Sequence, residues 1–146
     1  MSLFENQPGS TSSDAKKQFI DFITLQVFDD QYIDREEEKR ILETGIQKGI
    51  GVEEGLALMR QLAAEKGWVL ERDAEDRAKE TLERFAQNDG RVDKKEFEDA
   101  VALFKSATKG KIPEPEVKKR LKRMMEHNGW RAKEGGLFGS KWYSEI

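Results

Sequence analysis

The chain repeats one pattern along its length, and this self-similarity constrains its fold more than any other feature. When the sequence is shifted against itself by 59 residues, the segment Asp29–Asp34 lies on Asn88–Asp93. Three extra residues in the second copy raise the offset to 62 thereafter, so that Gly67-Trp68 lies on Gly129-Trp130. Agreement at such distinctive residues indicates a duplicated supersecondary unit. The two predicted copies span residues 14–68 and 73–130.

Apolar residues in both copies follow the spacing of one helix face. In the second copy, for example, Phe97, Ala100, Val101 and Phe104 stand at positions i, i+3, i+4 and i+7. No stretch has the alternation that is typical of a strand. The sequence therefore predicts an all-α fold with about six helices, in two pseudo-symmetric three-helix repeats that form one domain around a shared core. The residues predicted to be buried are Phe19, Ile20, Phe22, Ile23 and Val27; Ile41, Leu42 and Ile46; Leu56, Met59, Leu62 and Ala63; Ala78, Leu82, Phe85 and Ala86; Phe97, Ala100, Val101 and Phe104; and Val117, Leu121, Met124 and Met125.

The ends of the predicted helices carry recognisable residues. An aspartate side chain can accept a hydrogen bond from a backbone N–H in the first helical turn. Gly67 and Gly129 stand where a helix ends in a left-handed residue, and the tryptophan after each can fold back on the last turn. The predicted helix starts are Asp14, Asp34, a position near Val52, Asp73, Asp93 and the pair Pro113 and Pro115.

Composition excludes several kinds of site. The chain has no cysteine, which rules out disulfides and thiolate zinc sites, and its single histidine, His127, is expected to be exposed near a helix end. Carboxylates are so abundant that no pair stands out for acid–base catalysis. We therefore expect no enzymatic activity. Residues 1–13 lack the features of a signal peptide and are expected to be a flexible N-terminal segment of a cytoplasmic protein with no membrane span.

The loop before the second helix of each copy carries an acidic turn. In the second copy Asp89-Gly90 is followed by Asp93 and Glu96, which resembles the last part of an EF-hand loop. Counting back from Glu96 puts Phe85 at the first ligand position, so the loop is not a standard EF-hand. An aspartate followed three residues later by a glutamate also makes a capping box, which needs no metal. Both interpretations stay open at this point.

The same D-G-x-[IV]-[DS]-x-x-E turn, repeated within a small all-helical domain, is similar to the TerB-like (tellurite-resistance) family. That resemblance covers roughly residues 14–130 and rests on a short motif. It implies duplicated helical halves with acidic turns that have been associated with calcium. Gln31 replaces the turn glycine in the first copy, which departs from the pattern. The residues that the resemblance implies as metal ligands are Asp89, Asp93 and Glu96, and in the first copy Asp30, Asp34 and Glu37.

Charge is distributed unevenly along the chain. Residues 1–104 carry 15 Lys/Arg against 24 Asp/Glu, a net charge of −9, and residues 105–141 carry 11 against 4, a net charge of +7. The predicted last helix is locally basic, which raises nucleic-acid binding as an alternative. Glycines and aromatic residues combine in the tail, residues 135–146, which either packs on its own domain or docks on a partner. The candidate partner-binding residues are Lys118, Lys119, Lys122, Arg123, Phe138, Trp142 and Tyr143.

These observations favour a non-catalytic protein-interaction or adaptor domain with a protein partner. A calcium-binding protein that uses the acidic turns is the first alternative, and a nucleic-acid binder that uses the basic helix is the second.

Overall fold

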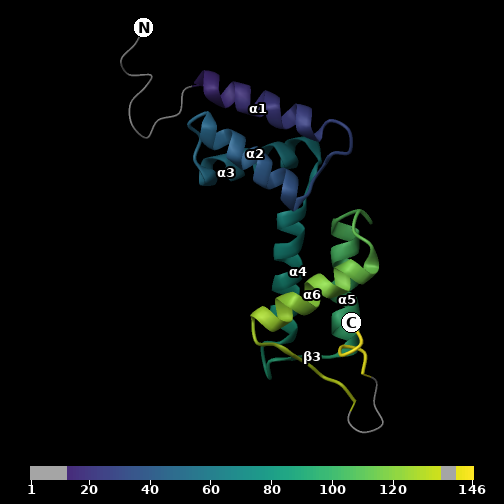
Figure 1. Cartoon of the computed structure of the whole chain (residues 1–146). Helices are drawn as coiled ribbons and strands as arrows, with labels where there is room; N and C mark the ends of the chain where they lie inside the picture. Colours follow the sequence, from purple (N-terminus) through teal and green to yellow (C-terminus); the bar gives the residue numbers. More distant parts are fainter. Residues whose placement is uncertain (1–12, 136–140) are drawn as a thin grey trace. The chain divides into compact units, whose positions relative to one another are not determined.

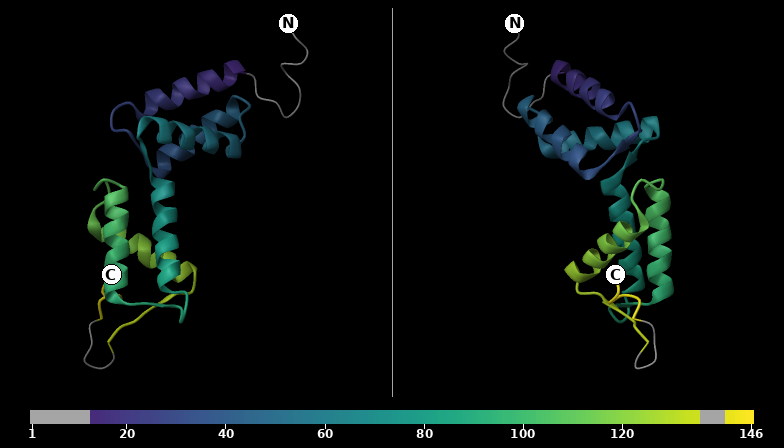
Figure 2. Two further views of the ribbon diagram at one scale, coloured as in Figure 1. Left: turned by 180° about the vertical axis from the view of Figure 1, so that it is seen from behind. Right: turned by 45° about the vertical axis from the view of Figure 1, so that its right-hand side comes forward.

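The computed structural model describes residues 13–135 and 141–146, and Figures 1 and 2 show its path. The chain divides into two compact units, Met1–Glu71 and Arg72–Ile146. This boundary lies in the short interval between the two copies seen in the sequence. Residues 1–12 of the predicted N-terminal segment lie outside the described residues, and Ser13 already belongs to a helix.

The predicted all-α fold is confirmed, with six helices in the described residues. Each unit has the same order of elements: a helix, a two-residue strand, two helices and a second two-residue strand. The elements of the first unit are α1 (Ser13–Val27), β1 (Tyr32–Ile33), α2 (Arg35–Gln47), α3 (Val52–Lys66) and β2 (Val69–Leu70). Those that follow are α4 (Glu71–Phe85), β3 (Arg91–Val92), α5 (Lys94–Ala107), α6 (Glu114–His127) and β4 (Arg131–Ala132).

The helix boundaries confirm two of the four predicted aspartate caps. Asp34 and Asp93 cap α2 and α5, and each side chain accepts a hydrogen bond from the backbone N–H three residues later. The predicted caps at Asp14 and Asp73 are wrong. Helix α1 already includes Ser13 and α4 begins at Glu71, so both aspartates lie inside the first turn, where a negative charge suits the helix dipole.

The four short strands contradict the expectation of a strand-free chain. In the first unit β1 pairs with β2 in parallel, with Tyr32 opposite Val69. In the second unit β3 pairs with β4 in the corresponding register, with Arg91 opposite Arg131. Two-residue strands are too short for an alternating pattern to be visible in a sequence. Each pair ties the turn after the unit's first helix to the segment that follows its third helix.

The Gly-Trp pairs end helices as predicted. Gly67 and Gly129 have left-handed backbones, with φ of 71° and 70°. The backbone N–H of Trp68 donates to the carbonyl of Ala63 at 3.0 Å, and that of Trp130 to the carbonyl of Met125 at 2.9 Å. Both indoles pack against the core of their own unit, so helix termination accounts for both pairs.

The buried residues form two clusters, one in each unit, so the single shared core that we expected is wrong. The predicted stripes supply most of both clusters, and all four predicted residues of α5 are buried. Ile46 is a wrong prediction, because 54% of its surface is exposed. It lies in the last turn of α2, beyond the point where Ile41 and Gly45 face the core.

At one pair of matching positions, the large and the small core residue are interchanged between the two units. In the first unit Phe19 packs against Gly45, where an added Cβ would lie 3.0 Å from the phenyl ring. At the corresponding positions, 59 residues later, the second unit has Ala78 and Phe104, both fully buried. A large residue and a small one have therefore exchanged helices. Both arrangements satisfy the close packing that protein interiors require.

No helix among the described residues has both the length and the apolar composition needed to cross a membrane.

Candidate interaction surfaces

The acidic turn of the second unit is organised by hydrogen bonds within the chain. Asp93 Oδ1 accepts from the backbone N–H of Glu96 at 2.7 Å, and Glu96 Oε1 accepts from that of Asp93 at 2.9 Å. This is a complete capping box. Asp89 Oδ1 accepts from the backbone N–H of Arg91 at 3.0 Å, and its Oδ2 lies 3.0 Å from Lys133 Nζ. The hydrogen bond from Lys133, followed by that from Arg91, lowers the pKa of the Asp89 carboxyl.

The acidic turn of the first unit has the same frame, with Asp34 as the cap of α2. Asp34 Oδ1 accepts from the backbone N–H of Glu37 at 2.8 Å, and Asp30 Oδ1 accepts from that of Tyr32 at 3.3 Å. Glu37 Oε2 is shielded from solvent and has no hydrogen-bond partner. Burial, and then the charges of Asp34 and Asp30, raise the pKa of Glu37. Gln31 takes the left-handed conformation, with φ of 57°, that Gly90 takes in the second unit.

These turns were the predicted metal sites. The structure brings the predicted ligands of each copy to one turn, but the capping role accounts for Asp34, Asp93 and Glu96. In the part of the chain that the structure describes, no three His, Asp or Glu side chains form a group that could hold a metal ion. Calcium binding at these turns stays a prediction.

The basic last helix carries its own counter-charges. Lys118 Nζ lies 4.0 Å from Glu114, and Arg123 lies 3.1 Å from Glu116. Arg120 contacts both Glu116 and Glu75, at 3.3 Å each. The hydrogen bond from Arg120 is the main reason that the pKa of Glu116 is lowered. Paired cations are less available to phosphates than the sequence alone indicated.

The C-terminal tail, where it is described, packs on the second unit. The ring of Trp142 lies 5.1 Å from that of Phe97, and the ring of Tyr143 meets Phe97 edge-on at 6.4 Å. Trp142 Nε1 donates to the carbonyl of Lys133 at 3.1 Å. Of the two interpretations of the tail, the structure thus favours self-packing for residues 141–146. Phe138 lies outside the described residues.

Lys122 contacts the tail of its own chain. Its Nζ donates to the main-chain oxygens of Tyr143 at 3.0 Å and Ile146 at 3.3 Å, and lies 4.7 Å from the centre of the Tyr143 ring. Three other predicted partner-binding residues, Lys118, Lys119 and Trp142, line one hollow of about 410 Å³ between the start of α6 and the tail.

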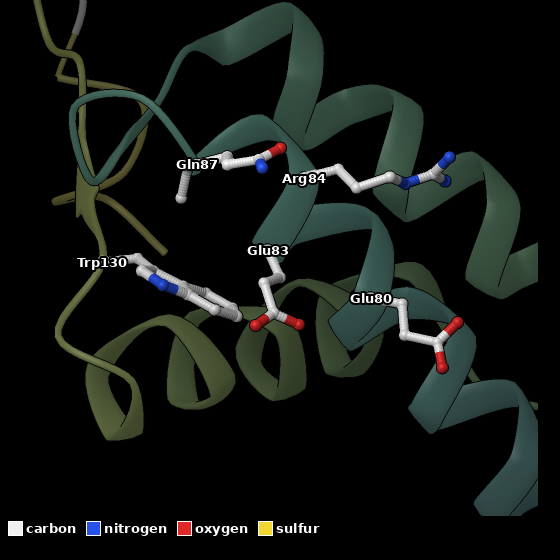
Figure 3. Close-up of a pocket in the computed structure, with 6 residues that line it drawn as sticks. Glu80, Glu83, Arg84, Gln87 and Trp130 are labelled. Carbon is white, nitrogen blue, oxygen red and sulfur yellow. The ribbon is translucent and has the colours of Figure 1, made fainter.

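A second hollow, of about 740 Å³, lies beside α4. Figure 3 shows Glu80 and Glu83 projecting from α4, with the indole of Trp130 facing them from the segment after α6. Arg84 and Gln87 complete the labelled wall. Apart from Ala86 and Trp130, the residues that line this hollow are polar or charged.

At two of the corresponding positions the first unit has large exposed apolar side chains, which the sequence interpretation missed. Leu25 and Phe28 stand 59 residues before Arg84 and Gln87, and each is 75% exposed. They are the most exposed large apolar side chains of the described chain. The available signal was their position at the end of α1: Leu25 lies in the last turn, off the stripe that Phe19, Ile23 and Val27 bury, and Phe28 directly follows the helix.

Comparisons with protein families, with curated proteins and with solved structures give no match to this chain. The resemblance to the TerB-like family stays a prediction.

Proposed function

We propose that this chain is a non-catalytic protein-interaction module and that its partner binds the first unit at Leu25 and Phe28. The exposure of these two side chains is the observation that carries the proposal. Exposed apolar residues that lie together are typical of protein–protein contacts. Covering both would contribute about 3–6 kcal/mol, at about 1.5–3 kcal/mol for each side chain.

The chemistry of the acidic turns supports a binding role over a catalytic one. The carboxylates of Asp34, Asp93 and Glu96 are occupied with helix N-termini, and Asp89 is paired with Lys133. Groups that hold backbone structure in this way are poorly placed to transfer protons to a substrate.

The test is affinity capture by the whole chain, compared with the variant L25R/F28Q. This variant gives the first unit the residues that the second unit has at the same positions. We expect the proteins captured by the wild type to be lost with the variant, as measured by quantitative mass spectrometry. Ile46→Gln is the matched control, because Ile46 is also an exposed apolar residue, 54% exposed, at the opposite end of α2 from the acidic turn.

Melting curves must show that L25R/F28Q folds like the wild type. If the folded variant captures the same proteins as the wild type, the module does not use this face and the proposal is wrong.

A further inference from the structure

The correspondence between the units relates Leu25, in the last turn of α1, and Phe28, directly after it, to Trp68. The backbone N–H of Val69 donates to the carbonyl of Gln31 at 3.0 Å, and that of Arg131 donates to the carbonyl of Gly90 at 2.8 Å. These bonds fix the segment after the third helix to the turn after the first helix in the same register. Trp68 therefore has the same position relative to α1 as Trp130 has relative to α4.

Because Trp130, Arg84 and Gln87 line one hollow, the matching residues Trp68, Leu25 and Phe28 share one face. We call these three residues the apolar face. Trp68 is half-buried against the core of the first unit, and Leu25 and Phe28 are each 75% exposed. The face offers three large apolar side chains from two different segments.

The segment that carries Leu25 and Phe28 is acidic. The segment 21–31 contains Asp21, Asp29 and Asp30 and no Lys or Arg, and all three aspartates are exposed. The described part of the first unit, residues 13–71, carries 8 Lys/Arg against 13 Asp/Glu, a net charge of −5. An apolar centre with an acidic rim calls for an apolar partner with a basic rim.

A second copy of the chain fits the apolar face poorly. In a two-fold dimer the same patch meets itself, so the aspartates of one copy would face those of the other.

We infer that the apolar face binds a basic amphipathic helix of a partner protein. This inference rests on the proposed function and names the partner's chemistry. Apolar residues of the partner at i, i+3 or i+4, and i+7 would pack on Leu25, Phe28 and Trp68, as in other helix-in-groove complexes. Lysines or arginines beside them would meet Asp21, Asp29 and Asp30, which speeds association and excludes acidic partners.

The probes are two designed 18-residue helical peptides with the same leucine face, one with lysines and the other with glutamates on the polar face. Each is titrated into the full chain while amide shifts are recorded by NMR. We expect the lysine peptide to shift residues 21–31 and 68 and to bind at least about 10-fold more tightly than the glutamate peptide. We also expect its affinity to fall when salt rises from 50 to 300 mM, because exposed charges are screened.

Two variants make the test specific. L25R/F28Q should weaken the binding of the lysine peptide by about 10-fold or more, since anchor residues dominate the binding energy of such contacts. The reciprocal variant R84L/Q87F places the apolar pair beside Trp130, where Glu80 and Glu83 supply an acidic rim. It should create a second site for the lysine peptide, with new shifts at residues 80–87.

Several outcomes would overturn the inference. They are equal binding of the two peptides, no binding of either, shifts that persist in L25R/F28Q, binding of anionic lipid vesicles through Leu25 and Phe28, or self-association that this variant abolishes. If affinity capture still depends on Leu25 and Phe28 in any of these cases, the proposed function stands and only the partner chemistry is wrong.

Discussion

The two units have the same elements in the same order and the same strand register, yet they differ in which apolar side chains are covered. Position 97 of the second unit is Phe97, which is buried and contacts the rings of Trp142 and Tyr143. The corresponding position of the first unit is Glu38, a buried carboxylate. The second unit thus uses the tail of the chain to extend its own core.

The first unit instead leaves apolar residues in solvent, at Leu25 and Phe28, where the second unit has Arg84 and Gln87. The shared frame therefore sets the backbone, and the side chains that differ between the units determine which surfaces are covered. We conclude that function is to be sought where the units differ.

The exchanged volumes in the two cores give the largest expected effect. Phe19→Ala should destabilise the first unit by about 3–5 kcal/mol, because it removes a fully buried ring. The double variant F19A/G45F copies the arrangement of Ala78 and Phe104 and should restore part of that loss, with a coupling energy of about 0.5–3 kcal/mol. Amide hydrogen exchange in α1 to α3 measures the stability of this unit separately.

Gly45→Phe alone is the control for this exchange and should be strongly destabilising, since even its Cβ would lie 3.0 Å from the ring of Phe19. A double variant no more stable than Phe19→Ala would show that the two cores are not interchangeable.

The tail gives the next largest effect. Deletion of residues 141–146 uncovers Phe97 and should cost the second unit about 2–4 kcal/mol, from lost apolar burial and lost aromatic pairing. We expect a loss of several degrees in the melting temperature of this unit and no change in hydrogen exchange in α1 to α3.

Lys122→Met should destabilise the second unit less than this deletion does. It removes the hydrogen bonds that Lys122 donates to Tyr143 and Ile146 but keeps the aliphatic stem. A tail that can be deleted without loss of stability would not be part of the fold.

Substitutions at the left-handed turn residues should change the stability of each unit by about 1 kcal/mol. Gln31 has a left-handed backbone, which costs a residue with a Cβ about 1–2 kcal/mol. Gln31→Gly should therefore stabilise the first unit by about 1 kcal/mol, and Gly90→Gln should destabilise the second by a similar amount. Denaturant midpoints of the two variants should shift in opposite directions. Shifts of the same sign would mean that backbone strain does not control these turns.

The sequence predicted the helical fold well because its signals were local. The helix spacing of Phe97 and Phe104, the caps at Asp34 and Asp93 and the left-handed glycines Gly67 and Gly129 all act within a few residues. The caps at Asp14 and Asp73 were predicted wrongly, because another residue before each could start the helix as well.

What could not be predicted depends on contacts between distant segments. Two examples are the pairing of Arg91 with Arg131 and the packing of Trp142 on Phe97, which join residues far apart in the sequence. The division into two cores likewise depends on which helices contact one another. The exposed pair Leu25 and Phe28 was visible as two apolar residues off the buried stripe. Its importance emerged only when the second unit showed polar residues at the same positions.

The smallest expected effect is on the pH dependence of stability, and it should differ between Glu37 and Glu96. Glu37 has a raised pKa, so the folded first unit holds its proton more tightly than the unfolded chain does. By linkage, this group favours folding at low pH, and that contribution is lost as pH rises through the usual value of 4.5 towards the raised one. Glu37→Gln, which stays neutral, should therefore stabilise the first unit more at pH 7 than at pH 4, as read from hydrogen exchange in α2.

Glu96→Gln is the matched control, because Glu96 holds the same position in the second unit, where its carboxylate accepts a hydrogen bond from the backbone N–H of Asp93. Its amide can keep that bond but lacks the negative charge at the N-terminus of α5, so this change should destabilise the second unit slightly at pH 7. The two substitutions thus act in opposite directions at neutral pH. If Glu37→Gln also destabilised its unit, the carboxylate of Glu37 would have to be supporting α2 as a charge, and the two turns would be equivalent after all.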